Sequence, residues 1–217
     1  METLKELNKL TEPDPRNDFT IAMDPSAPGG YRRLTVAERH RQMARLELSE
    51  SVPETVRKAF AVTRTLWLYG WFYWSFYTLA GFHAILCLDM ALAIRIAREE
   101  GMPNPPAKTP PLQEMLKRAI ESNWITDKGI AHARHLHDRW TQICVEVPEE
   151  TYETSPDPLE ESPQRYCRIL LETLPGQRNS FAHPKHYWHG VPDSSYLIIE
   201  NVHDLIQQLF HDEVVRS

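Results

Sequence analysis

Apolar residues recur at intervals of three and four along several stretches of the chain, and this spacing predicts helices. The clearest stretch is Leu112–Ile125, whose apolar face consists of Leu112, Met115, Leu116, Ala119 and Ile120. The last stretch follows a candidate cap at Asp193 or Ser194. Its expected buried side consists of Leu197, Ile198, Val202, Leu205, Ile206, Leu209 and Phe210. No stretch shows the alternation expected of a strand, so the pattern predicts an all-α fold of five or six helices.

Two more helical regions are expected before residue 102. Leu34–Ser51 carries charges at helical spacing, and Thr35 precedes Glu38 at the spacing of a capping box. Residues 54–102 contain no proline and are mostly apolar, which predicts one long helix or two helices joined near Gly81. The basic last turn and the stop of this region are supplied by Arg95, Arg98 and Gly101.

Proline and charge divide the rest of the chain. Residues 1–33 hold four prolines and predict an irregular N-terminal arm, so that residues 34–217 form the helical domain. Within that domain, residues 102–111 contain five prolines and predict a linker. Residues 146–163 contain seven acids and no basic residue, which predicts a solvated acidic loop.

Two shorter helices are expected in the second half of the chain. One covers His132–Val147, and the other covers Gln164–Leu174. The second helix is expected to be interrupted by Pro175 and Gly176, because proline lacks the N–H group that a helix interior needs.

The segment Thr65–Leu88 contains 24 residues without a formal charge and holds nine of the 21 aromatic residues. Its length would suit a membrane span. Spans usually place Trp and Tyr at the two interfaces, whereas here the aromatics fill one half of the segment. We therefore expect a buried central helix that also offers a dimer surface, and membrane association through residues 65–88 remains the alternative.

Composition narrows the classes of function. The net charge of −6 argues against a broadly basic surface for nucleic acid, although it allows a local basic site. The three cysteines are odd in number and far apart, which favours a reducing compartment. The first ten residues lack the apolar stretch of a secretory signal, so we expect a cytoplasmic location without a membrane. The motifs of nucleotide hydrolases, esterases, thiol oxidoreductases and zincins are missing from the sequence.

A local reversal of charge lies between Glu172 and Asp193, where the sequence contains no acid. The cationic and titratable residues there are Arg178, His183, Lys185, His186 and His189. Among them is the run Arg178-Asn179-Ser180-Phe181-Ala182-His183, which reads R-N-x-x-x-H and precedes Pro184.

This arrangement resembles the HEPN superfamily (higher eukaryotes and prokaryotes nucleotide-binding), whose all-α domains carry an arginine, a polar residue and a histidine at this spacing. The order of segments is similar as well: an aromatic-rich helix pair, a short helix, the motif and a terminal apolar helix. The resemblance covers roughly residues 55–210, and its specific part is the six-residue motif.

The resemblance implies metal-independent cleavage of RNA by a homodimer whose active site lies across the two-fold axis. It implies that Arg178 and His183 carry the reaction, with Asn179 as the polar motif residue, and that no cofactor is needed. Many members are toxins or defence nucleases, so a regulatory or antitoxin protein is a possible partner. Other members are inactive scaffolds, which leaves an RNA-binding or protein-binding scaffold as an alternative.

The chemistry of the motif agrees with this expectation. RNA is cut by its own 2′-hydroxyl once a base removes the proton, and histidine suits proton transfer near neutral pH. Arginine offers a charged fork that matches phosphate. Five residues at about 100° each place Arg178 and His183 roughly 140° apart on one helix, so a symmetric dimer would bring both groups together better than one copy does.

Three further residues are candidates for supporting roles. Asp89 is the only acid between Arg64 and Glu99, and it could hold Arg178, pair with Arg95 or cap a local donor. Lys185 and His186 follow the motif closely. No metal is expected at the two histidine clusters, because neither has a cysteine or carboxylate at ligand spacing. These clusters are His132, His135 and His137, and His183, His186 and His189.

Overall fold

A computed structural model describes residues 5–106, 108–135, 164–182 and 191–211. This part of the chain is all-α, as the sequence predicts. Its α-helices are α1 (Val36–Ala44), α2 (Glu54–Tyr69), α3 (Ser75–Glu99), α4 (Leu112–Glu121), α6 (Arg165–Ala182) and α7 (Pro192–Leu209). Three short 3-10 helices accompany them: η1 (Leu7–Lys9), η2 (Pro15–Phe19) and η3 (Asp127–Gly129). Residues 131–135 are also helical.

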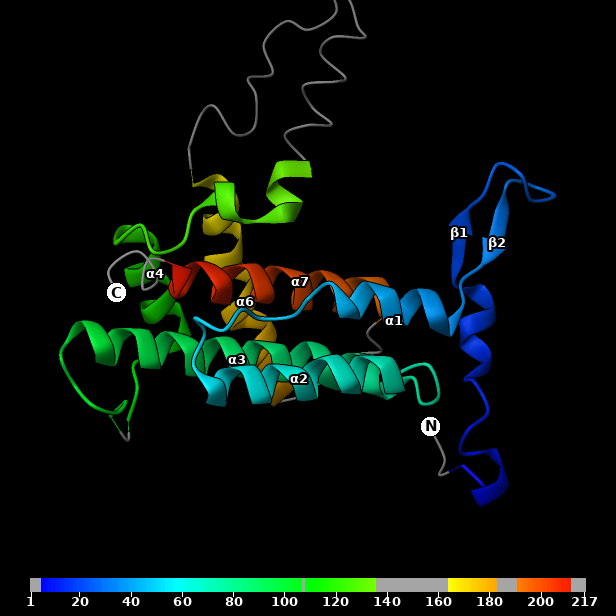
Figure 1. The fold of residues 1–217 in the computed structure, drawn as a ribbon, viewed down its shortest axis with the longest axis horizontal. Helices are drawn as coiled ribbons and strands as arrows, with labels where there is room; N and C mark the ends of the chain where they lie inside the picture. Colours follow the sequence, from blue (N-terminus) through cyan, green and yellow to red (C-terminus); the bar gives the residue numbers. More distant parts are fainter. Residues whose placement is uncertain (1–4, 107, 136–163, 183–190, 212–217) are drawn as a thin grey trace, which may run out of the picture.

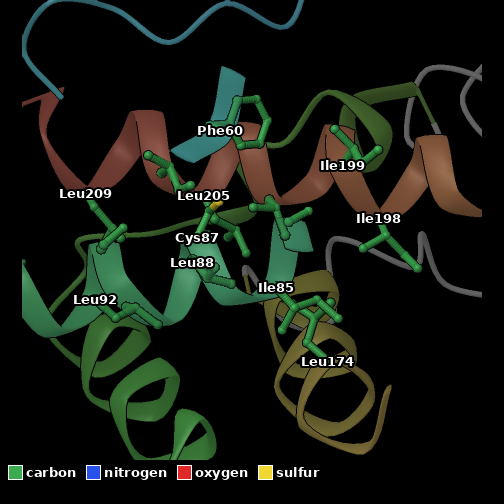
Figure 2. Close-up of a cluster of buried hydrophobic side chains, with 14 of the residues drawn as sticks. Phe60, Ile85, Cys87, Leu88, Leu92, Leu174, Ile198, Ile199, Leu205 and Leu209 are labelled. Carbon is green, nitrogen blue, oxygen red and sulfur yellow. The ribbon is translucent and has the colours of Figure 1, made fainter. Parts of the chain in front are cut away.

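The long helix α3 lies at the centre of the bundle. It packs along α2 on one side and α7 on the other, and α6 crosses behind this group and contacts α3 and α4 (Figure 1). The core holds side chains from α2, α3, α6 and α7 (Figure 2). Ile85, Leu88 and Leu92 of α3 are completely buried there. Burial on most of its circumference explains why α3 lacks the one-sided pattern of a surface helix.

The aromatic segment folds as two helices, and the predicted position of the break near Gly81 is wrong. The chain turns between Tyr69 and Ser75, whereas Gly81 lies inside α3. At Gly70 a Cβ atom would stand 2.6 Å from the ring of Tyr77, so this turn needs the smallest residue. The segment 65–88 is therefore not one continuous helix.

The helix α3 is long and apolar enough to cross a membrane, judged by length and composition alone. An 18-residue stretch of α3 has a mean hydropathy of 1.8, and 61% of that stretch is buried inside the protein. Central helices of soluble proteins have the same properties, so this is weak evidence for a membrane span.

Several helix ends follow the local signals. The hydroxyl of Thr35 accepts from the backbone N–H of Glu38 and the Glu38 carboxylate accepts from the Thr35 N–H, which completes the predicted capping box. Gly101 ends α3 with a φ of +68°, and Met102 N–H donates to the Ala97 carbonyl at 2.8 Å. Helix α1, however, ends at Ala44 and does not reach Ser51 as predicted.

The two apolar stripes are confirmed with two corrections: Leu197 is not fully buried, and neither Asp193 nor Ser194 is the cap of the last helix. All five residues of the α4 stripe are buried. On α7 every residue of the expected side is buried except Leu197, which is half-buried. The cap of α7 is Val191, followed by Pro192 at the first helical position. Asp193 lies one residue further in, where its carboxylate pairs with Arg39 at 3.0 Å.

The N-terminal arm contains a hairpin that the sequence did not predict. Strands β1 (Ile21–Met23) and β2 (Tyr31–Arg33) pair antiparallel beside the bundle (Figure 1). Three residues are too few to show a clear alternation, and the connecting turn depends on positive φ angles at Gly29 and Gly30. The arm contacts the turn between α2 and α3 through Asn17, whose side-chain amide donates to the Trp71 carbonyl at 2.7 Å.

Helix α6 continues through Pro175, so the predicted interruption there is wrong. Proline leaves the carbonyl four residues earlier without its helical donor. Burial of Leu170 and Leu174 against the core holds the helix together across this gap. The predicted helix at His132–Val147 falls within the described residues only up to residue 135, and the predicted acidic loop at 146–163 lies outside them.

The first turn of α6 is capped from a distance by Asp127. Its carboxylate accepts hydrogen bonds from the backbone N–H groups of Tyr166 at 2.9 Å and Cys167 at 2.8 Å. These are two of the N–H groups that the start of a helix leaves without partners.

Replacing Asp127 by alanine is expected to lower the free energy of unfolding by roughly 2 kcal/mol, the upper end of the range for a helix cap. The carboxylate is buried, so its loss leaves two buried donors unpaired. Urea unfolding followed by circular dichroism measures the change. Lys128→Ala, at the exposed neighbouring position, is the control, and equal stability of both variants would contradict the assignment.

Candidate functional site

The motif arginine faces the central helix of the bundle. Arg178 lies in the last two turns of α6, and its Nη2 donates to Oδ2 of Asp89 on α3 at 3.0 Å. Of the three roles considered for Asp89, the structure therefore has the ion pair with Arg178. The other arginine considered, Arg95, lies 3.8 Å from Glu99 and over the ring of Trp124.

Helical spacing and an aromatic contact position Arg178. Leu174, one turn earlier on α6, is buried in the core, and residues four apart share one face of a helix. Phe181, in the last turn of α6, packs against Phe82 of α3 with ring centroids 5.4 Å apart. The turn that carries Arg178 is thus held against α3 on both sides.

The ion pair leaves part of the guanidinium available. The Arg178 side chain is 38% exposed, and that of Asp89 is 19% exposed. Within the described residues, Nε of Arg178 is buried and has no hydrogen-bond partner. A charged donor without a partner is costly when buried, so this group favours an additional acceptor.

A cavity of about 400 Å³ lies next to the ion pair. One wall comes from α3 and α6 and consists of Asp89, Pro175, Arg178 and Asn179. The other wall comes from the proline-rich segment and the start of α4, and consists of Lys108, Thr109, Pro110, Pro111, Leu112 and Gln113. The N-cap residue of α4 is Pro111, whose side chain makes no capping hydrogen bond. Two cations, one carboxylate and two amides therefore line the cavity.

Three predicted site residues lie outside the described residues: His183, Lys185 and His186. In the sequence His183 directly follows Ala182, the last residue of α6. The structure thus brings Arg178, Asn179 and Asp89 together around one cavity.

Burial shifts the pKa of three further titratable groups in or near the core, His83, Cys87 and Cys167. Nδ1 of His83 lies 2.8 Å from the Thr63 hydroxyl, and burial lowers the pKa of this histidine. Burial raises the pKa of the Cys87 thiol to about 11 and also raises that of Cys167, so both thiols are protonated at neutral pH.

The histidine cluster before residue 140 shows no sign of a metal site in its described part. The ring of His132 packs against that of Tyr166, with centroids 5.6 Å apart. Across the described residues, no group of three His, Cys, Asp or Glu side chains could hold a metal ion. His135 is exposed, and the other four members of the two clusters, His137, His183, His186 and His189, lie outside the described residues.

Sequence reasoning missed the second wall of the cavity. Lys108, Thr109 and Gln113 belong to a segment that we interpreted as a linker and to the polar face of the following helix. A lysine and a threonine among five prolines in residues 102–111 were the available signal. These residues lie close to α6 only because of the way α4 packs, and that packing could not be predicted from the sequence.

Comparisons with protein-family models, with curated proteins and with solved structures find no match to this chain. Any assignment of function therefore depends on the residue pattern and the geometry of the site.

Proposed function

We propose that the chain is a metal-independent endoribonuclease of the HEPN type, with a toxin or defence role. The observation that carries this proposal is the position of Arg178, which is held by Asp89 at the edge of a cavity lined by Asn179 and a second cation, Lys108. The R-N-x-x-x-H spacing brings His183 within one residue of the end of the same helix.

The proposed chemistry uses each motif residue in one role. His183 takes the proton from the 2′-hydroxyl of RNA, whose oxygen then attacks the adjacent phosphorus. The P–O5′ bond breaks, and the leaving 5′-oxygen takes up the proton that His183 had accepted, so that the products are a 2′,3′-cyclic phosphate and a free 5′-hydroxyl. Arg178 stabilises the negative charge on the phosphorus-bound oxygens. Asn179 orients the phosphate, and Lys185 and His186 add positive charge beyond the helix.

A homodimer is part of this proposal. The helix α3 exposes an apolar stripe made by Leu79, Leu86 and Met90, which recur at spacings of seven and four and therefore share one face. This stripe runs past Asp89, so an isologous interface on it would bring two copies of the site near one axis. A regulatory protein would act by covering the same surface.

The decisive experiment is RNA cleavage by the purified chain in excess EDTA. We expect fragments that end in a 2′,3′-cyclic phosphate, and we expect none from His183→Ala. The matched control is His135→Ala, which changes a histidine of the other cluster.

If the RNA stays intact and the chain is a soluble dimer, the nuclease proposal is wrong and the inactive-scaffold alternative is favoured. If the chain needs detergent to stay in solution, the membrane-associated alternative is favoured. Cleavage that EDTA abolishes would also overturn the proposal, because it would show a metal-dependent reaction.

A further inference from the structure

The wall of the cavity opposite Arg178 has the composition of a nucleotide subsite. Lys108 contributes a cation from the segment before α4, and Thr109 and Gln113 contribute polar groups. Lys108 is exposed, and it takes part in none of the ion pairs recorded among the described residues. The charge of Arg178 is balanced by Asp89, so Lys108 gives the lining its net positive charge.

The volume and the surface of the cavity define what fits. A volume of about 400 Å³ lies within the range of small-ligand sites and has room for one nucleotide. Three prolines, Pro110, Pro111 and Pro175, present rigid apolar surfaces beside the charged groups. A ligand with a phosphate at one end and a flat or ring-shaped apolar part at the other matches this lining.

We infer that Lys108 binds a backbone phosphate of single-stranded RNA next to the phosphate at Arg178, with the intervening nucleoside against the proline surfaces. This inference rests on the proposed RNA substrate. It makes Lys108 a positioning residue, because it holds the substrate in place without touching the bond that breaks. The expected loss on its removal is therefore in binding and not in the rate of the bound complex.

The test uses the full chain and a fluorescently labelled RNA hexamer with 2′-O-methyl groups, which lacks the hydroxyl needed for cleavage. Lys108→Ala is expected to weaken binding three- to tenfold. It is also expected to reduce the slope of log K against log salt by about 0.7, the change for one lost phosphate contact on a single strand. Lys108→Arg should restore both values, since it keeps the charge.

The matched control is Lys117→Ala, which removes an exposed lysine from α4 outside the cavity. Equal affinity and salt slope for Lys108→Ala and wild type would overturn the inference, as would saturable binding that Lys117→Ala weakens equally. A wild-type chain that fails to bind the hexamer would overturn it too.

Failure of the inference and failure of the proposed function give different results. The hexamer assay does not need cleavage, so hexamer binding that depends on Lys108 would stand even if unmodified RNA remained intact. Conversely, cleavage of unmodified RNA with the same KM in Lys108→Ala and wild type would refute the subsite and leave the nuclease proposal in place. A raised KM at constant kcat supports the positioning role.

Discussion

Replacing Arg178 by alanine is expected to reduce the rate of RNA cleavage by about 10²–10³-fold, the usual loss when one stabilising donor to a developing oxyanion is removed. The guanidinium is partly exposed at the cavity and its Nε–H lacks a partner among the described residues, so the group can donate hydrogen bonds to a phosphate oxygen. Initial rates on labelled RNA in EDTA, at saturating substrate, measure the effect. The cleavage rate of Arg178→Lys should lie between those of wild type and Arg178→Ala, because lysine keeps the charge but lacks the planar fork of the guanidinium.

The matched control for this prediction is Arg168→Ala, which removes an exposed arginine from the first half of the same helix. Its cleavage rate should stay within about twofold of wild type. The circular dichroism spectrum of Arg178→Ala should match that of wild type, because the ion pair with Asp89 is only partly buried and contributes little to stability. Undiminished cleavage by folded Arg178→Ala would contradict the role assigned to the motif.

Replacing Trp67 by alanine is expected to lower the free energy of unfolding by about 3–5 kcal/mol. The indole is completely buried on α2, and its Nε1 donates to the Ser195 hydroxyl at 3.0 Å. It also packs edge-on to Tyr77 and under the guanidinium of Arg39, with 5.2 Å between the ring centroid and Cζ. One side chain therefore joins α1, α2, α3 and α7.

Thermal unfolding of this variant should show a midpoint about 10 °C below that of wild type. The control is Tyr69→Ala, two residues along the same helix, where the ring is 55% exposed and far less apolar surface returns to water. Comparable losses in both variants would show that the buried cluster around Trp67 contributes no more than a surface aromatic.

Local signals in the sequence predicted the parts of the fold that depend on neighbours along the chain. The stripe of α4 and the capping box at Thr35 need only residues within one or two turns, and both are present. Gly101 ends α3 for the same reason. The same signals did not predict the hairpin of β1 and β2, because each of its strands is only three residues long.

Contacts between distant segments could not be predicted in the same way. The chain turns at residue 70, where only glycine fits because the Tyr77 ring occupies the space of a side chain, and Gly81 offered an equally plausible break in the sequence. Pro175 stays helical because α6 is anchored in the core. Asp89 and Arg178 are separated by 89 positions, so their pairing could be named only as one of three alternatives.

The proline within α6 divides the helix into two parts that differ in cooperativity. The part before Pro175 begins at the Asp127 carboxylate and buries Leu170 and Leu174, so it can open only with the whole core. The part after Pro175 carries Arg178 and begins one main-chain hydrogen bond short. We therefore expect local opening of the part that carries Arg178 to cost less than global unfolding, so that this part can rearrange around a ligand while the rest of the bundle stays intact.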